Sequence, residues 1–201
     1  MEHKGDKGCD YKSHPPLDHS KSLNEFKDMG IPIYAPYLKI DYMSMNMGGF
    51  TVKPFDLTTI DGNWTHTDAN GEPCPIFGFL IMHPEMGRML YITDCEVIKW
   101  KFKDINHILL GVNYDKDLVD TDNPKANHVF RGHLSIDTAC DFVKANDSDS
   151  LQNVIMCHLS SENADKDSFI EKMKNAVNGA NVDVAEQGKS WILQNPNSCP
   201  F

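Results

Sequence analysis

Basic charge, paired cysteines and long apolar runs are all scarce in this 201-residue sequence. It has 19 lysines and arginines against 29 acidic residues, which gives a formal net charge of −10, and Arg88 and Arg131 are its only arginines. A protein that coats nucleic acid through its whole surface needs a basic footprint, so this charge balance excludes that class. A phosphodiester substrate is still compatible with it, because a bound cation can supply the local positive charge.

The six cysteines include no CxxC pair. A disulfide scaffold is usually shorter and richer in cysteine, so we interpret these residues as reduced thiols, although their even number leaves a bridge open. No apolar run approaches the ~20 residues that a membrane-spanning helix requires. The polar N-terminus does not have the pattern of a secretory signal. These absences predict a cytoplasmic protein that has no membrane partner.

Length and composition are those of one globular domain. Hydrophobic residues make up 40% of the chain and charged residues 24%, which is ordinary for such a domain. No internal repeat and no low-complexity linker divides the sequence. We therefore expect a single domain over residues 1–201, with the polar residues 1–13 disordered.

Apolar patterns predict an alternation of strands and helices. Strands are expected at residues 31–34, 50–55, 76–82, 88–93, 108–112 and 154–157. Helices are expected at residues 19–29 with a stop at Gly30, at 135–144 with Ser135 as N-cap, and at 165–177. A long polar loop is expected over residues 56–75, and a closing hairpin from 182–184 and 191–193. Helices interposed between strands predict an α/β domain with helices packed on a sheet.

Some aromatic, histidine and cysteine positions are expected to be structural. Phe50, Phe55, Phe77 and Phe79 fit the apolar alternation and are predicted to lie in the core. His83 and His107 are expected at turns or on the surface. Cys95 and Cys157 adjoin candidate ligands, and neighbours on a strand point to opposite faces, so both are expected in the core.

Histidine and aspartate residues that could bind a metal gather at predicted strand ends and on one short turn. Residues 14–19 (HPPLDH) place His14, Asp18 and His19 directly before a helix. The other candidates follow apolar runs or lie in loops: His66, Asp94, His133 and His158. Imidazole nitrogens and carboxylates are good ligands for zinc and similar cations, and the ends of buried strands are favourable positions for a site. Each residue alone could also be structural, as an exposed loop residue, a turn cap or a hydrogen-bonded core histidine.

The ordered set of short strings resembles the metallo-β-lactamase superfamily. These strings are DHSKSLNEFKDMGIPIYAP, FTVKPFDL, EPCPIFGFLI, GRMLYITD, VNYD, RGHLS and MCHLSSEN, and they span residues 14–163. The resemblance is strongest to small prophage-encoded metallo-hydrolases, which are distantly similar to ribonuclease J and tRNase Z. It implies an αββα sandwich, with two sheets between outer helices.

The resemblance also implies a role for each candidate. His14, Asp18 and His19 would belong to the H-x-H-x-D-H metal turn, and His66 would complete the first metal site. Asp94 would bridge two metals, and His158 would complete the second site. The two residues expected to act in catalysis are Asp18 and His133, the latter contacting the substrate phosphate or assisting the leaving group.

Two positions depart from the superfamily pattern. Pro16 stands where the metal turn has its second histidine, so the first metal site lacks a ligand, whereas the second keeps Asp18, His19, Asp94 and His158. Only thirteen residues precede His14, so we expect the first N-terminal strands of the sandwich to be missing. An exposed sheet edge and apolar face would then favour a homo-oligomer.

The function implied is metal-assisted hydrolysis of a phosphodiester, with one or two zinc ions; manganese or iron are alternatives. The missing ligand and short N-terminus are expected to impair it. Nucleic acid and cyclic nucleotides are both possible substrates, so a cyclic-nucleotide phosphodiesterase is one alternative. The other is a non-catalytic remnant of the fold that acts in binding or assembly.

Overall fold

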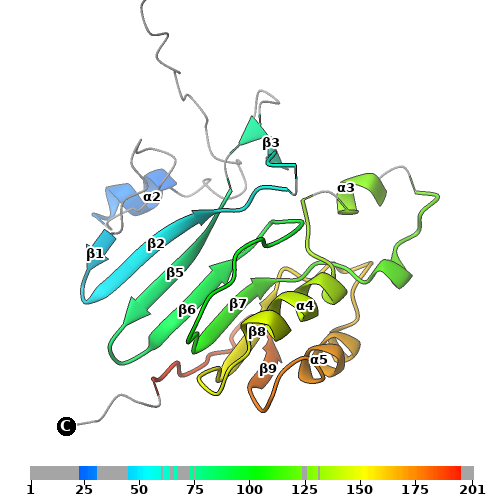
Figure 1. The fold of residues 1–201 in the computed structure, drawn as a ribbon. Helices are drawn as coiled ribbons and strands as arrows, with labels where there is room; N and C mark the ends of the chain where they lie inside the picture. Colours follow the sequence, from blue (N-terminus) through cyan, green and yellow to red (C-terminus); the bar gives the residue numbers. More distant parts are fainter. Residues whose placement is uncertain are drawn as a thin grey trace, which may run out of the picture.

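The structure is a computed structural model (Figure 1). It describes residues 23–30, 45–59, 61–63, 66–67, 73–74, 76–123, 126–130 and 132–195. In chain order its elements are α2 (Leu23–Asp28), β1 (Met45–Met47), β2 (Phe50–Asp56), β3 (His66–Thr67), β4 (Pro73–Cys74), β5 (Phe77–His83), β6 (Gly87–Ile92), β7 (His107–Gly111), the 3-10 helix η2 (Lys116–Leu118), α3 (Ala126–Phe130), α4 (Ile136–Asn146), β8 (Asn153–Cys157), α5 (Lys166–Lys174) and β9 (Asn181–Val184).

Seven strands form one mixed sheet in the order β1-β2-β5-β6-β7-β8-β9. Strands β1, β2, β5 and β6 pair antiparallel, and the β5–β6 hairpin turns at Gly87, which has a φ of 84°. Strands β6 to β9 pair parallel, which requires crossover connections, and α4 and α5 provide two of them. The short strands β3 and β4 form a separate pair within the region predicted to be a polar loop.

Helices α4 and α5 lie side by side against one face of the sheet (Figure 1). On the strands beneath them, Leu90, Ile108 and Val154 share this face and are fully buried. Phe142 from α4 and Phe169 from α5 join the same core. Each large apolar side chain buried in this way contributes ~1.5–3 kcal/mol, so this layer is the main source of stability.

The opposite face of the sheet is only partly covered within the described residues. Phe79 and Tyr91 lie here with their ring centroids 6.4 Å apart, beside Ile81 and Leu109, and all four are half-buried. The stretch after β9 returns to the β5–β6 turn, where the Asn195 N–H donates a 2.6 Å hydrogen bond to the carbonyl oxygen of Glu85.

Most predicted elements are confirmed. Ser135 is the N-cap of α4 and its hydroxyl accepts from the Thr138 N–H, and Asp165 caps α5 in the same manner. Helix α2 confirms part of the helix predicted at residues 19–29, and Gly30 ends it with a φ of 72°. The strand predicted at residues 31–34 lies outside the described residues. The predicted α/β class is observed, with one large sheet and the β3–β4 pair in the described part.

The closing hairpin is a wrong prediction. β9 pairs parallel with β8, and residues 191–193 form no strand. Side-chain bonds hold the stretch after β9 instead: the Lys189 ammonium and the Trp191 indole N–H both donate to the Asp183 carboxylate, at 2.6 and 2.9 Å. An apolar run of three residues did not distinguish this arrangement from a strand.

Several single-residue predictions are also wrong. His107 is buried at the start of β7, where its ring lies 3.0 Å from the Met86 carbonyl oxygen and 2.9 Å from the Asn153 amide nitrogen. Of the four phenylalanines predicted in the core, Phe55 packs against it, whereas Phe77 and Phe79 are half-buried outside it. Phe50 is exposed, and its ring centroid lies 4.5 Å from that of His83. Cys95 is a buried core residue, as predicted, whereas Cys157 is half-buried. Within the described part of the chain, no helix is long and apolar enough to cross a membrane.

Candidate metal centre

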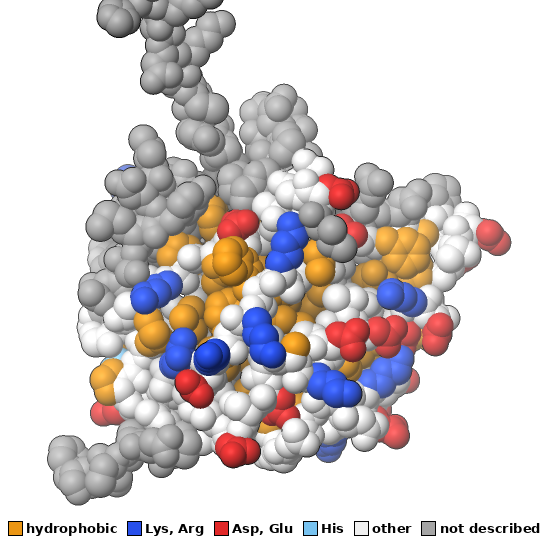
Figure 2. All heavy atoms as spheres, in the orientation of Figure 1, with side chains coloured by type: hydrophobic (Ala, Val, Ile, Leu, Met, Phe, Trp, Pro, Cys, Tyr) orange, Lys and Arg blue, Asp and Glu red, His pale blue; other side chains and the backbone are white. Residues whose placement is uncertain are grey.

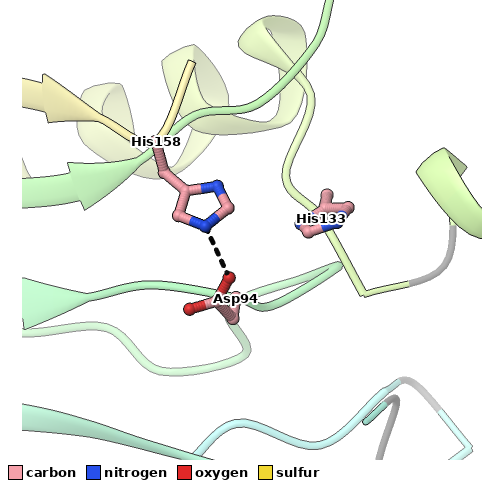
Figure 3. Close-up of side chains that lie close together, drawn as sticks. All are labelled: Asp94, His133 and His158. Carbon is pink, nitrogen blue, oxygen red and sulfur yellow. Dashed lines mark ion pairs between the residues drawn. The ribbon is translucent and has the colours of Figure 1, made fainter. Parts of the chain in front are cut away.

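Three side chains from separate segments converge at the carboxyl end of the parallel strands. They are Asp94, His133 and His158, and one nitrogen or oxygen of each lies within 4.8 Å of the others. His158 Nε2 is 3.3 Å from Asp94 Oδ1, and the two imidazole rings are 5.6 Å apart between centroids. Figure 3 shows the two histidines and the carboxylate facing a common space.

The parallel pairing of β6, β7 and β8 explains the convergence. Asp94 lies just beyond β6 and His158 directly follows β8, so both arrive at the same edge of the sheet. Gly111 ends β7 between them, and a Cβ there would lie 3.1 Å from the Thr93 Cα. A Cβ at Gly111 would therefore require the Thr93 backbone, next to Asp94, to shift by a few tenths of an ångström.

Asp94 and His158 both adopt the left-handed backbone conformation, with φ values of 55° and 62°. Residues other than glycine adopt this conformation infrequently, and such strained positions cost about 1–3 kcal/mol and often occur at functional sites. Asp94 is 6% exposed, whereas the His158 side chain is 45% exposed. The pair therefore joins a buried carboxylate to an imidazole that solvent can reach.

His133 is held by the segment that leads into α4. Gly132 precedes it with a φ of 96°, and the next residue, Leu134, is buried. The Leu134 carbonyl oxygen accepts a hydrogen bond of 2.9 Å from the Asn113 N–H, which fixes this segment to the end of β7. The N-cap at Ser135 then sets where the helix begins, so His133 stands just before it at the sheet edge.

Asn113 positions the ring of His158. Its side-chain Nδ2 donates to the His158 carbonyl oxygen at 3.0 Å and lies 3.3 Å from His158 Nδ1. These two contacts hold the imidazole with Nε2 facing the Asp94 carboxylate. The backbone of Asn113 bonds to both Leu134 and Ser160, so one residue ties together the two histidine-bearing segments.

The Asp94 carboxylate influences the side chains around it. Burial, and then the charge of Asp94, raise the pKa of Cys157 to about 11 and that of Cys95 to about 12. Burial is also the main reason that the pKa of Tyr91 is raised. These groups are therefore neutral near pH 7, and Asp94 supplies negative charge to a poorly solvated edge of the sheet, where a cation is attracted strongly.

The His158–Asp94 pair has the spacing of two ligands of a zinc-like cation, and a ring nitrogen of His133 lies within 4.8 Å of both. Two ligand atoms at about 2.0–2.1 Å from a tetrahedral zinc ion lie about 3.3–3.5 Å apart, and the His158–Asp94 pair is already at 3.3 Å. Two imidazoles and one carboxylate form a donor set used by catalytic zinc sites, and manganese or iron can use it too. The exposed side of His158 leaves room for a water or substrate.

The structure thus brings together three of the seven residues singled out from sequence. His133, expected to contact substrate, lies close enough to act as a ligand as well. His66 lies in β3, and its side chain is not among those described. His14, Asp18 and His19 fall outside the described residues, so their roles stay predictions.

Sequence reasoning missed Asn113 and Gly111. Both stand at the end of β7, between the strands that carry Asp94 and His158. The strand itself was predicted, so a polar residue directly after it was a usable signal. The strand order, which places β7 in the middle, was not available from the sequence.

Comparison with solved structures identifies the fold. The chain is similar to the metallo-beta-lactamase fold protein YhfI from Bacillus subtilis, with a TM-score of 0.51 and 13% sequence identity. The match covers 86% of this chain and 61% of YhfI, so the chain spans less than two thirds of that protein's length. No protein-family model and no curated protein sequence matches. The likeness shows the metallo-β-lactamase fold that the sequence predicted.

Proposed function

We propose that this protein is a metal-dependent hydrolase that cleaves phosphodiester bonds, with Asp94, His133 and His158 in its metal centre. The observation that carries the proposal is the meeting of one carboxylate and two imidazoles at the carboxyl edge of the sheet, in a metallo-β-lactamase fold. The left-handed backbone at both Asp94 and His158 supports it, because strained positions often occur at functional sites.

The residues of the metal centre have different proposed roles, which follow from how far each is exposed to solvent. Asp94 supplies a buried negative charge, and Asn113 orients the more exposed ring of His158. A divalent cation, when bound, makes water acidic enough to lose a proton near neutral pH and neutralises charge on the substrate. His133 lies beside His158, where its ring can bind the cation or donate a proton to a leaving oxygen.

The fuller site is proposed from the sequence pattern. Asp18 and His19 would join Asp94 and His158 in the tighter of two zinc sites, and His14 and His66 would belong to a weaker one. Asp18 would also hold the attacking water in position. The phosphodiester class follows from the resemblance of the ordered strings, and nucleic acid and cyclic nucleotides are the two substrate groups to compare.

Metal content provides the direct test. Protein purified without added metal should contain zinc, manganese or iron by elemental analysis, and His158→Ala should lose most of it. His66→Ala should lose less, and His83→Ala, a histidine outside the cluster, should lose none. Activity should be assayed on RNA, DNA and cyclic nucleotides with and without a chelator. Equal metal loss in all three variants would contradict the proposed centre.

A second candidate function, favoured by Pro16, is a binding or assembly protein that retains the fold without turnover. Proline cannot replace the second histidine of the metal turn, and two-metal phosphoryl chemistry requires both cations. Pro16→His should then raise the bound metal toward two ions per chain and increase hydrolysis. Strong, chelator-sensitive turnover by the unmodified protein would exclude this candidate.

A further inference from the structure

An apolar pocket lies away from the three metal-centre side chains, on the helix-bearing face of the sheet beside β2 and β5. Its volume is about 590 Å³, which is within the range of small-molecule sites. The residues that line it are Lys53, Pro54, Phe55, Asp56, Phe77, Leu80, Trp100 and Phe102. Figure 2 shows hydrophobic side chains gathered on this face, with lysine and arginine side chains around them.

Aromatic rings form the walls of this pocket. Phe55 packs against Phe102 with 4.9 Å between ring centroids and meets Trp100 edge-on at 6.4 Å. The indole N–H of Trp100 is already bonded to the Asp56 carbonyl oxygen at 2.8 Å, yet the residue is 46% exposed. The surface that Trp100 offers to a ligand is therefore ring carbon, which favours an apolar ligand body.

The same lining disfavours a polar body such as a nucleobase. A base buried edge-first would leave its amino and carbonyl groups without partners, and burying unpaired polar groups costs free energy. An alkyl chain has no such groups. Each methylene that enters the pocket should tighten binding about fourfold, from the usual transfer free energy of a buried methylene.

Lysines surround the apolar lining. Residues 99–103 read Lys-Trp-Lys-Phe-Lys, and all three lysines are exposed. Lys99 reaches back over the end of β2, where its ammonium lies 3.1 Å from the Thr58 hydroxyl, and Lys53 is exposed at the pocket. This local positive charge is opposite in sign to the net charge of −10.

The one carboxylate among the lining residues does not cancel this charge. Side chains alternate along a strand, so Asp56 points to the face of the sheet opposite to Lys53 and Phe55. Its backbone carbonyl oxygen accepts the hydrogen bond from the Trp100 indole N–H. The pocket therefore combines an apolar interior with a cationic rim.

We propose that this pocket binds an amphipathic anion: a medium-length alkyl chain that carries a single carboxylate or phosphate head. The chain lies against Phe55, Trp100 and Phe102, and the head group meets Lys53 and Lys99. The inference does not rest on the metal centre or on hydrolysis. Fatty acids and alkyl phosphates share this chemistry, and paired probes distinguish them.

The test uses the full chain and decanoate, with decyl phosphate and decanol as companions. Of the three tryptophans, Trp64 and Trp191 are replaced by phenylalanine, so that only Trp100 emits. A bromine-labelled decanoate should then quench Trp100 saturably at one site per chain, because heavy-atom quenching requires contact. Octanoate should bind about 15-fold more weakly than decanoate, as two fewer methylenes predict. The tighter of decanoate and decyl phosphate identifies the head group.

Charge variants complete the test. Lys53→Gln combined with Lys99→Gln should weaken decanoate binding at least fivefold and leave decanol binding unchanged. Lys116→Gln, at an exposed lysine on η2, should change neither. Thermal unfolding of each variant checks that it is folded, and His158→Ala should bind decanoate normally.

Three results would overturn the proposal. The first is quenching that does not saturate. The second is equal loss of binding in the Lys116 control. The third is displacement of decanoate by a ten-nucleotide oligothymidylate that binds more tightly through the same two lysines, because the surface would then be a site for single-stranded nucleic acid.

Discussion

His158 Nε2 lies 3.3 Å from Asp94 Oδ1, and both residues have left-handed backbone, with φ values of 62° and 55°. Two strand ends separated by β7 therefore stop in the same uncommon conformation and point their side chains at one another. Each left-handed residue costs about 1–3 kcal/mol of folding free energy, and the packing of the surrounding sheet must offset this cost. The fold thus holds a carboxylate and an imidazole ready for a cation.

Asp94→Asn should separate metal binding from stability. Asparagine has the same shape and tolerates the left-handed backbone, so the free energy of unfolding should change by less than about 1 kcal/mol. Loss of the carboxylate charge should weaken metal binding by on the order of 100-fold or more, measured by isothermal titration calorimetry. Asp104→Asn is the matched control, since Asp104 is exposed and has a φ of 53°. Similar metal affinity in both variants would argue against the centre.

Asn113→Ala should reduce metal affinity more than it reduces stability. The substitution removes the hydrogen bonds from Nδ2 to the ring and carbonyl oxygen of His158 and leaves that ring free to rotate. Loss of a residue that orients a metal ligand typically lowers metal affinity by about 10–100-fold. Loss of its hydrogen bonds should lower the free energy of unfolding by only about 1 kcal/mol. Asn178→Ala, which removes a side-chain bond to Asp147, should leave metal affinity unchanged. A metal affinity unaffected by Asn113→Ala would show that Asn113 does not position the ligand.

The ion pair between Asp115 and Lys172 should make the free energy of unfolding depend on pH in the acidic range. The Lys172 ammonium lies 2.6 Å from Asp115 Oδ2, and its hydrogen bond holds the pKa of Asp115 below the usual 3.8. A depressed carboxyl pKa stabilises the folded state above the unfolded-state pKa, and this stability is lost as the pH falls through the folded-state pKa. Lys172→Met should therefore lower stability by about 1 kcal/mol at pH 7, a figure reduced because Lys172 is 37% exposed.

Urea unfolding at several pH values checks this ion pair. The difference between the unmodified protein and Lys172→Met should be full at pH 7 and should shrink below pH 3.8, as Asp115 is protonated. Lys174→Met, on the same helix and exposed, is the control and should cost little at any pH. A pH-independent difference would indicate that Lys172 stabilises by packing alone.

Self-association through the sheet face opposite α4 and α5 remains a prediction. Phe79, Ile81, Tyr91 and Leu109 share this face and are only half-buried, and contiguous apolar surface commonly marks an interface. Light scattering at micromolar concentration should give a mass above the chain mass of 22.7 kDa, and Ile81→Lys should lower it. Ile192→Lys, at a residue that is 82% exposed, should not change the mass. A mass of 22.7 kDa for the unmodified protein would contradict the prediction.

Local signals in the sequence predicted the elements that depend on local chemistry. Ser135 correctly predicted where α4 begins, because a serine side chain can accept a hydrogen bond from a free N–H of the first helical turn. The β5–β6 hairpin followed from two apolar runs joined by a turn with Gly87. The prediction of a hairpin from residues 182–184 and 191–193 was wrong because side-chain bonds from Lys189 and Trp191 to Asp183 hold that stretch, and an apolar run of three residues does not reveal such bonds.

The sequence by itself determined the α/β class, the strands that end at Asp94 and His158, and the residue types able to bind a metal. Composition, periodicity and strand-end position are properties of short segments, and they can be read along the chain. Only the tertiary structure decided that Asp94 and His158 touch, that Asn113 orients the imidazole, and that His133 joins them. Those relations depend on the strand order β6-β7-β8 and on the approach that Gly111 permits, and both arise from packing between segments far apart in the sequence.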